Sequence, residues 1–97
     1  MATIAQADRK AINLQRKLQR KYPELLVIVY PQQGDLAIKA TCDTLPTLEA
    51  RDWLNEDLTA ADLFRIACSV IDSAVKVVKD AAQRDAEWLE ECRKMQH

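Results

Sequence analysis

Glycine and proline are scarce in this sequence. There is one glycine and there are three prolines among 97 residues, so the chain can form few tight turns and long regular elements are favoured. A loop that cradles phosphate groups needs several glycines close together. The single glycine therefore excludes a nucleotide-binding loop of that kind.

Residues with catalytic or metal-binding chemistry are also few. The one histidine, His97, is the last residue, so the sequence offers no dependable histidine base for a cysteine nucleophile. Cys42, Cys68 and Cys92 are 26 and 24 residues apart, which fits neither a disulfide framework nor a zinc site. We interpret them as reduced thiols that pack as small apolar residues. The sequence thus predicts no catalytic residue, metal or cofactor, and a protein that is not an enzyme.

Long hydrophobic runs are absent as well. No window approaches the ~20 apolar residues of a membrane span, and the first residues do not resemble the apolar core of a signal peptide. Together with reduced thiols, this predicts a cytoplasmic protein. Hydrophobic residues make up 48% of the chain and charged residues 30%, which is typical of a globular protein and predicts a single domain over residues 1–97.

The first predicted element is a helix over residues 5–21. Its apolar residues recur at steps of three and four, which places them on one stripe: Ile4, Ala7, Ala11, Leu14 and Leu18. Thr3 and Gln6 have the spacing of a capping box. Pro23 disfavours the helical conformation of the residue before it and so ends the helix.

Residues 25–30 and 36–41 predict a β-hairpin. The first run is continuously apolar, and the second alternates, with Leu36, Ile38 and Ala40 on one face. Gly34 supplies a positive φ angle to the predicted turn at residues 31–35. Because the first strand is apolar on both faces, we expect a second neighbour or a cover for it. The candidates are residues 43–50, the N-terminal helix and another chain.

Residues 43–57 allow two interpretations. We expect a short helix with Thr47 as its capping residue, passing through Trp53 and Leu54. The alternative is a short third strand, which would extend the hairpin.

Residues 58–96 predict one long amphipathic helix, because they contain no glycine or proline and their apolar residues recur at helical spacing. Thr59 and Asp62 match its start. An unbroken helix of ~38 residues is roughly 55 Å long, whereas a compact domain of this size has a radius of gyration of about 12–13 Å. The helix must therefore break, with residues 83–85 as the expected place, or project and meet a partner.

These elements predict an α+β fold in which the two main helices pack on each other and on the hairpin. The predicted core comprises Ile4, Ala11, Leu14, Leu18, Val27, Val29, Leu36, Ile38, Leu63, Ala67, Val70, Ile71, Ala74 and Val78.

Charge is distributed unevenly along the chain. Residues 1–22 carry a net charge of +5 and residues 43–97 a net charge of -5, although the whole chain carries only -1. The two regions could pair within one molecule or between molecules. The basic residues of the first helix lie away from its apolar stripe, and they are candidates for contacts with nucleic-acid phosphates: Arg9, Lys10, Arg16, Lys17, Arg20 and Lys21.

The apolar face of the last helical turns is the main candidate for partner binding. It consists of Trp88, Leu89, Cys92 and Met95, residue types that include those enriched at binding hot spots. The alternative is that this segment folds back on its own domain. We expect a small interaction protein, such as an adaptor, inhibitor or assembly factor of the size common in phages and mobile elements. Its partner would be another protein or a second copy in a homo-oligomer, with nucleic-acid binding as the alternative function.

Overall fold

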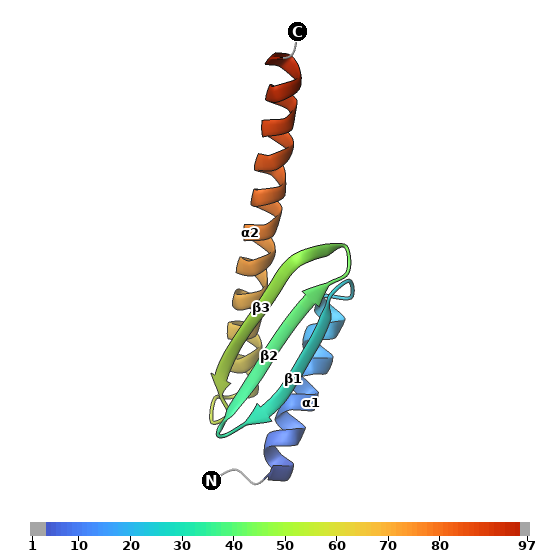
Figure 1. Ribbon diagram of the computed structural model, residues 1–97. Helices are drawn as coiled ribbons and strands as arrows, with labels where there is room; N and C mark the ends of the chain where they lie inside the picture. The colour runs from blue at the N-terminus through green and yellow to red at the C-terminus, as the bar shows by residue number, and fades with distance from the viewer. Residues whose placement is uncertain (1–3, 96–97) are drawn as a thin grey trace.

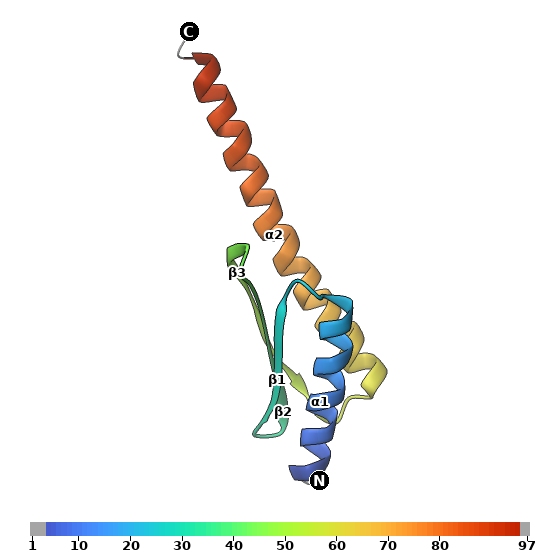
Figure 2. The same cartoon turned by 90° about the vertical axis from the view of Figure 1, so that its right-hand side faces the viewer.

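The computed structural model describes residues 4–95, with side chains described from Ala7 onward. The elements are helix α1 (Ile4–Lys21), strands β1 (Leu26–Gln32), β2 (Asp35–Cys42) and β3 (Leu45–Asn55), and helix α2 (Ala60–Met95). The strands form one antiparallel sheet in the order β1-β2-β3, and both helices cover the same face of it (Figures 1 and 2). The predicted α+β class is confirmed.

Helix α1 forms where the apolar stripe predicted it. Ala7, Ala11, Leu14 and Leu18 are all buried against the sheet side of the molecule, and the helix ends at Lys21, two residues before the proline. Thr3, the predicted capping residue, and the side chains of Ile4 and Gln6 lie outside the described residues.

The predicted hairpin is confirmed, with a tighter turn than expected. Gln33 and Gly34 form the turn with φ angles of 48° and 86°, and two successive positive φ angles are typical of the type I′ turns that join antiparallel strands. Strand β1 therefore continues through Pro31 and Gln32, which pair with Leu36 and Asp35. The twist of such a turn matches the twist of the strands, so pairing extends up to it.

The short helix predicted within residues 43–57 is wrong, and the third-strand alternative is right. Residues 45–55 form β3, which pairs with β2 through Leu54 opposite Leu36 and Ala50 opposite Ala40. Leu48, Ala50 and Leu54 alternate toward the core. A capping residue at Thr47 stabilises a helix only locally. The hydrogen bonds between β2 and β3 and the burial of the apolar face of β3 together stabilise the strand more.

Strand β1 lies at the edge of the sheet, so of the three candidates for its second neighbour or cover, residues 43–50 are excluded. Helix α1 closes this edge instead. The backbone N–H of Val27 donates to Gln19 Oε1 at 3.1 Å, and that of Val29 donates to Gln15 Oε1 at 2.9 Å. Pro31 is the next residue of β1 whose backbone nitrogen faces away from β2, and proline has no N–H group. The edge therefore lacks the free donors with which another strand would pair.

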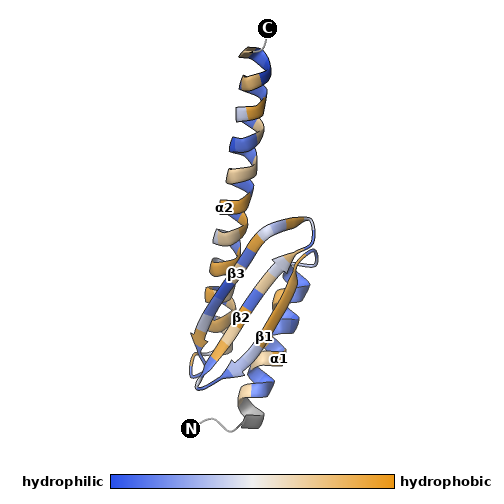
Figure 3. Ribbon diagram, viewed as in Figure 1, coloured by the Kyte–Doolittle hydropathy of each residue, from blue (hydrophilic) through white to orange (hydrophobic). Residues whose placement is uncertain are grey.

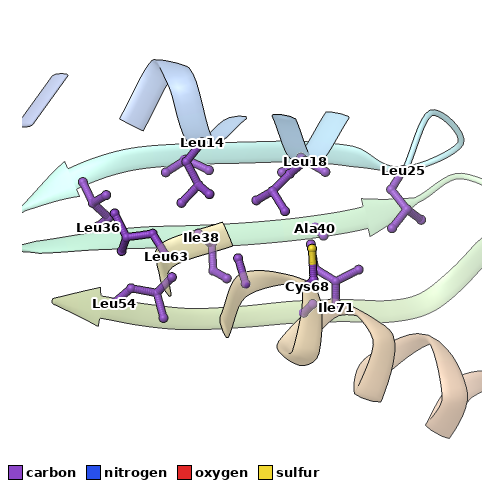
Figure 4. Close-up of a cluster of buried hydrophobic side chains, with 14 of the residues drawn as sticks. Leu14, Leu18, Leu25, Leu36, Ile38, Ala40, Leu54, Leu63, Cys68 and Ile71 are labelled. Carbon is purple, nitrogen blue, oxygen red and sulfur yellow. The ribbon is translucent and has the colours of Figure 1, made fainter. Parts of the chain in front are cut away.

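The core lies between the sheet and the two helices (Figure 4). Most of the predicted core is confirmed as buried: Ala11, Leu14, Leu18, Val27, Val29, Leu36, Ile38, Leu63, Ala67 and Ile71. Val70, Ala74 and Val78 are only half-buried and pack at its margin. The body therefore ends, along α2, within about two turns of Ile71.

Helix α2 runs without a break through residues 83–85. The hydroxyl of Thr59 accepts the backbone N–H of Asp62 at 3.1 Å, which confirms the predicted cap. Because the helix is longer than the body, the molecule measures 67 × 20 × 19 Å and its radius of gyration is 17.5 Å. Figures 1 and 2 both show the C-terminal half of α2 standing clear of the sheet.

Candidate functional site

The projecting segment, defined as residues 79–95 of α2, holds the residues predicted to bind a partner. Trp88, Leu89 and Met95 are 62%, 61% and 75% exposed, respectively, and Cys92 is half-buried. Their spacing places them on one side of the helix, and Figure 3 shows apolar residues recurring along α2 beyond the sheet. The alternative in which this segment folds back on the body is not what the structure shows.

Local sequence explains why the segment stays helical without support. It contains no glycine or proline, and the Gln83 amide donates to Glu87 Oε1, one turn further on, at 3.4 Å. Arg93 and Lys94 lie in the last turn, where positive charge interacts favourably with the helix dipole. Local helix propensity therefore keeps the projecting segment helical, although its large apolar side chains pack against no other described part of the protein.

The six basic residues of α1 divide into two groups. The Lys10 ammonium donates to the backbone carbonyl of Glu56, and the Lys21 ammonium lies 5.5 Å from the ring centre of Tyr22 and 5.7 Å from that of Phe64. These two lysines contribute to packing. Lys21 is nevertheless exposed, as are the other four along the outside of α1: Arg9, Arg16, Lys17 and Arg20.

No ion pair joins the basic and acidic regions among the side chains that the structure describes. Over residues 4–95 the ion pairs are Arg51 with Glu49 and Arg65 with Asp62, and neither joins α1 to α2. The charge distribution allowed the basic and acidic regions to pair within one molecule or between molecules. Pairing within one molecule is not formed in the described part of the protein.

A second exposed apolar surface lies on the outer face of the sheet, away from the helices. It consists of Leu26, Ile28, Tyr30 and Trp53, which are 60%, 41%, 48% and 53% exposed. Ala37 lies between Tyr30 and Trp53 in the register and is only 3% exposed, because the two rings flank it. The sequence indicated this surface, because residues 25–30 are apolar on both faces of the strand. The predicted site residues nevertheless did not include it.

A cleft of about 520 Å³ opens where α2 leaves the body, beside the β2–β3 turn and the end of α1. In it the Tyr22 hydroxyl donates to Asp72 Oδ1 at 2.6 Å. Burial, together with this hydrogen bond, raises the pKa of Tyr22 well above its usual value. The phenol therefore stays protonated and ties the end of α1 to α2.

Cys42 and Cys68 are buried in the core, as predicted for small apolar residues, whereas Cys92 is half-buried on the projecting segment and outside the core. The Cys42 thiol borders the cleft, 3.1 Å from the Thr44 hydroxyl. That hydrogen bond lowers the pKa of Cys42. Across residues 4–95 no group of three His, Cys, Asp or Glu side chains is arranged to hold a metal ion.

The described helices include none that combines the length and the apolar character needed to cross a membrane. Comparison of the chain with protein families, with curated proteins and with solved structures finds no match. Exposure, charge and the geometry of the two surfaces are therefore the basis for assigning a function.

Proposed function

We propose that the protein is a small non-enzymatic interaction module that binds a protein partner, or itself, through the projecting segment. The observation that carries this proposal is the continuation of α2 beyond its own body with Trp88, Leu89 and Met95 exposed. Single exposed apolar residues are ordinary, but a row of them on an otherwise unsupported helix marks an interaction surface.

The energetics favour a partner for this segment. An isolated helix is marginal in water and gains most of its stability by packing an apolar face. Tryptophan at the centre of an interface often contributes more than 2 kcal/mol to binding. The body has its own core around Leu18 and Leu36, both 0% exposed, so binding at the segment requires no rearrangement of the body. This division suits an adaptor, an inhibitor or an assembly factor.

Removing the apolar side chains of the segment should abolish assembly. We expect the double variant Trp88→Ala, Leu89→Ala to lose at least about 30-fold in affinity, the equivalent of roughly 2 kcal/mol. The body should stay folded, with an unchanged urea midpoint relative to a monomeric chain, because neither side chain belongs to its core. Mass in solution and capture of partner proteins from the cell of origin are the measurements.

The matched control is Glu90→Ala, which changes the next residue along, on the polar side of the same helix. It should leave both measurements unchanged. Unaltered mass and unaltered partners in the Trp88→Ala, Leu89→Ala variant would contradict the proposed function.

A second candidate function is nucleic-acid binding by α1. It is favoured by the five exposed basic residues of that helix, Lys21 included, which form no ion pair within the described part of the chain. Arg9, Arg16 and Arg20 lie on the side opposite the buried stripe, so phosphate contacts at these positions would not disturb the core.

This candidate predicts a salt-dependent affinity. If three phosphates are neutralised, affinity should fall roughly 40-fold between about 50 and 200 mM salt. Replacing Arg9, Arg16 and Arg20 with glutamate should remove binding, as measured by fluorescence anisotropy with a labelled duplex and a labelled single strand. The control with the same charge change replaces Lys76, Lys79 and Arg93 instead. Absence of binding by the natural chain at low salt would exclude this function.

A further inference from the structure

We infer that the partner of the projecting segment is a second copy of this chain, whose α2 lies antiparallel against the first. This inference rests on the proposed function and specifies its partner. The contact surface is the uncovered stripe, a set of residues on one side of α2 that starts at the margin of the body and continues beyond it, with Leu89 beside it: Ala74, Val77, Ala81, Trp88, Cys92 and Met95.

The uncovered stripe is symmetric about the point between Arg84 and Asp85. Going outward from that point in either direction, its residues lie at the same distances along the helix. An antiparallel pair with a twofold axis there places each residue opposite one from the other copy. Trp88 then faces Ala81, and Met95 faces Ala74 of the second copy.

Side-chain size supports this pairing. The half of the stripe nearer the body contains the small residues Ala74 and Ala81, and the far half contains the large residues Trp88 and Met95. Antiparallel packing sets large side chains against small ones, which lets two helices approach closely and interdigitate. A parallel pair would instead set Trp88 against its own copy and leave the two alanine rows facing each other across a gap.

Charge selects the same orientation. Residues 76–84 carry three basic residues and one acidic residue, a net charge of +2, whereas residues 85–95 carry four acidic and two basic residues, a net charge of -2. Antiparallel pairing brings each positive half against a negative half. Parallel pairing would bring like halves together, which is unfavourable at this close range.

The length of α2 also fits an antiparallel pair. The last fully buried residue of the helix is Ile71, and Ala74 and Val78 are half-buried at the margin of the body. In the antiparallel pair Met95 of the second copy reaches the level of Ala74, so the described part of the second helix extends to the margin of the body. The shared length, residues 74–95, is about 32 Å. Val77, which is 64% exposed, lies at the same level as Cys92 of the second copy.

Thiol cross-linking tests both the partner and the orientation. The variant Val77→Cys places a thiol opposite Cys92 of the second copy, and mild oxidation should link most of the chain into covalent dimers. The natural chain should not cross-link, because the two copies of Cys92 are roughly 22 Å apart along the pair, well beyond the reach of a disulfide. Lys79→Cys, on the opposite side of α2, is the matched control and should stay unlinked.

A further variant identifies the sulfur atoms involved. Adding Cys92→Ser to Val77→Cys should abolish the covalent dimer, whereas a parallel pair would still link position 77 to its own copy. Light scattering of the untreated natural chain should give twice the monomer mass of 11.0 kDa, and the Trp88→Ala, Leu89→Ala variant should return it to that mass.

Two results would overturn the inference without contradicting the proposed function. One is a Cys92–Cys92 disulfide in the natural chain, which only a different orientation permits. The other is a monomeric mass at all concentrations, with no cross-link in Val77→Cys. In that second case, capture of a different protein that depends on Trp88 and Leu89 would leave the proposed function standing. If the Trp88→Ala, Leu89→Ala variant assembles normally, the proposed function fails and the inference fails with it.

Discussion

The substitution Leu18→Ala is expected to lower the free energy of unfolding by about 3–5 kcal/mol, which is most of the stability of a domain this small. Leu18 is 0% exposed and belongs to the cluster that joins α1 to the sheet (Figure 4). Removing its side chain leaves a cavity that neighbouring strands, held by backbone hydrogen bonds, cannot collapse to fill. Urea denaturation followed by circular dichroism gives the measurement.

The matched control is Leu26→Ala, the same chemical change at a position 60% exposed on the outer face of the sheet. It removes little buried area, so we expect a loss below about 1 kcal/mol. Similar losses for the two variants would mean that α1 does not pack on the sheet as the structure describes.

Truncation after Ala82 is expected to separate assembly from folding completely. The shortened chain should be monomeric, because Trp88, Cys92 and Met95 are removed. Its urea midpoint should stay close to that of a monomeric full-length chain, such as the Trp88→Ala, Leu89→Ala variant, because residues 83–95 contribute nothing to the core. The expected difference in the free energy of unfolding is within about 0.5 kcal/mol.

Light scattering and urea denaturation of the two chains check this result. A truncated chain that stays dimeric would place self-association on another surface, and the outer face of the sheet, with Tyr30 and Trp53 exposed, would then be the first to examine. A truncated chain that is markedly less stable than the monomeric variant would show that the segment packs on its own body in solution.

Much of the fold could be predicted because its signals are local. The stripe from Ala7 to Leu18, the proline at position 23 and the cap at Thr59 each act within a few residues, and the structure has all of these elements where the sequence predicts them. The hairpin is similar, since Gly34 and the flanking apolar runs specify a turn between neighbouring strands.

The third strand could not be predicted from local signals in the same way. Residues 45–55 carry a weak helical cap as well as a partial alternation, and the balance depends on whether β2 offers a free edge for pairing. That edge belongs to a different part of the chain, so only the assembled sheet settles the competition. Gln15 and Gln19, which close the opposite edge, carry no local signal of that role either.

The sequence alone identified the candidate site but not its accessibility. An apolar stripe that includes Trp88 and Met95 follows from helical periodicity, and the helix length exceeds what one small body can cover. Whether that stripe folds back, breaks or projects depends on where the body's own apolar surface ends. The tertiary structure places that limit near Ile71 and Val78, because α1 and three strands bury the first third of α2, and no other described residue covers the rest.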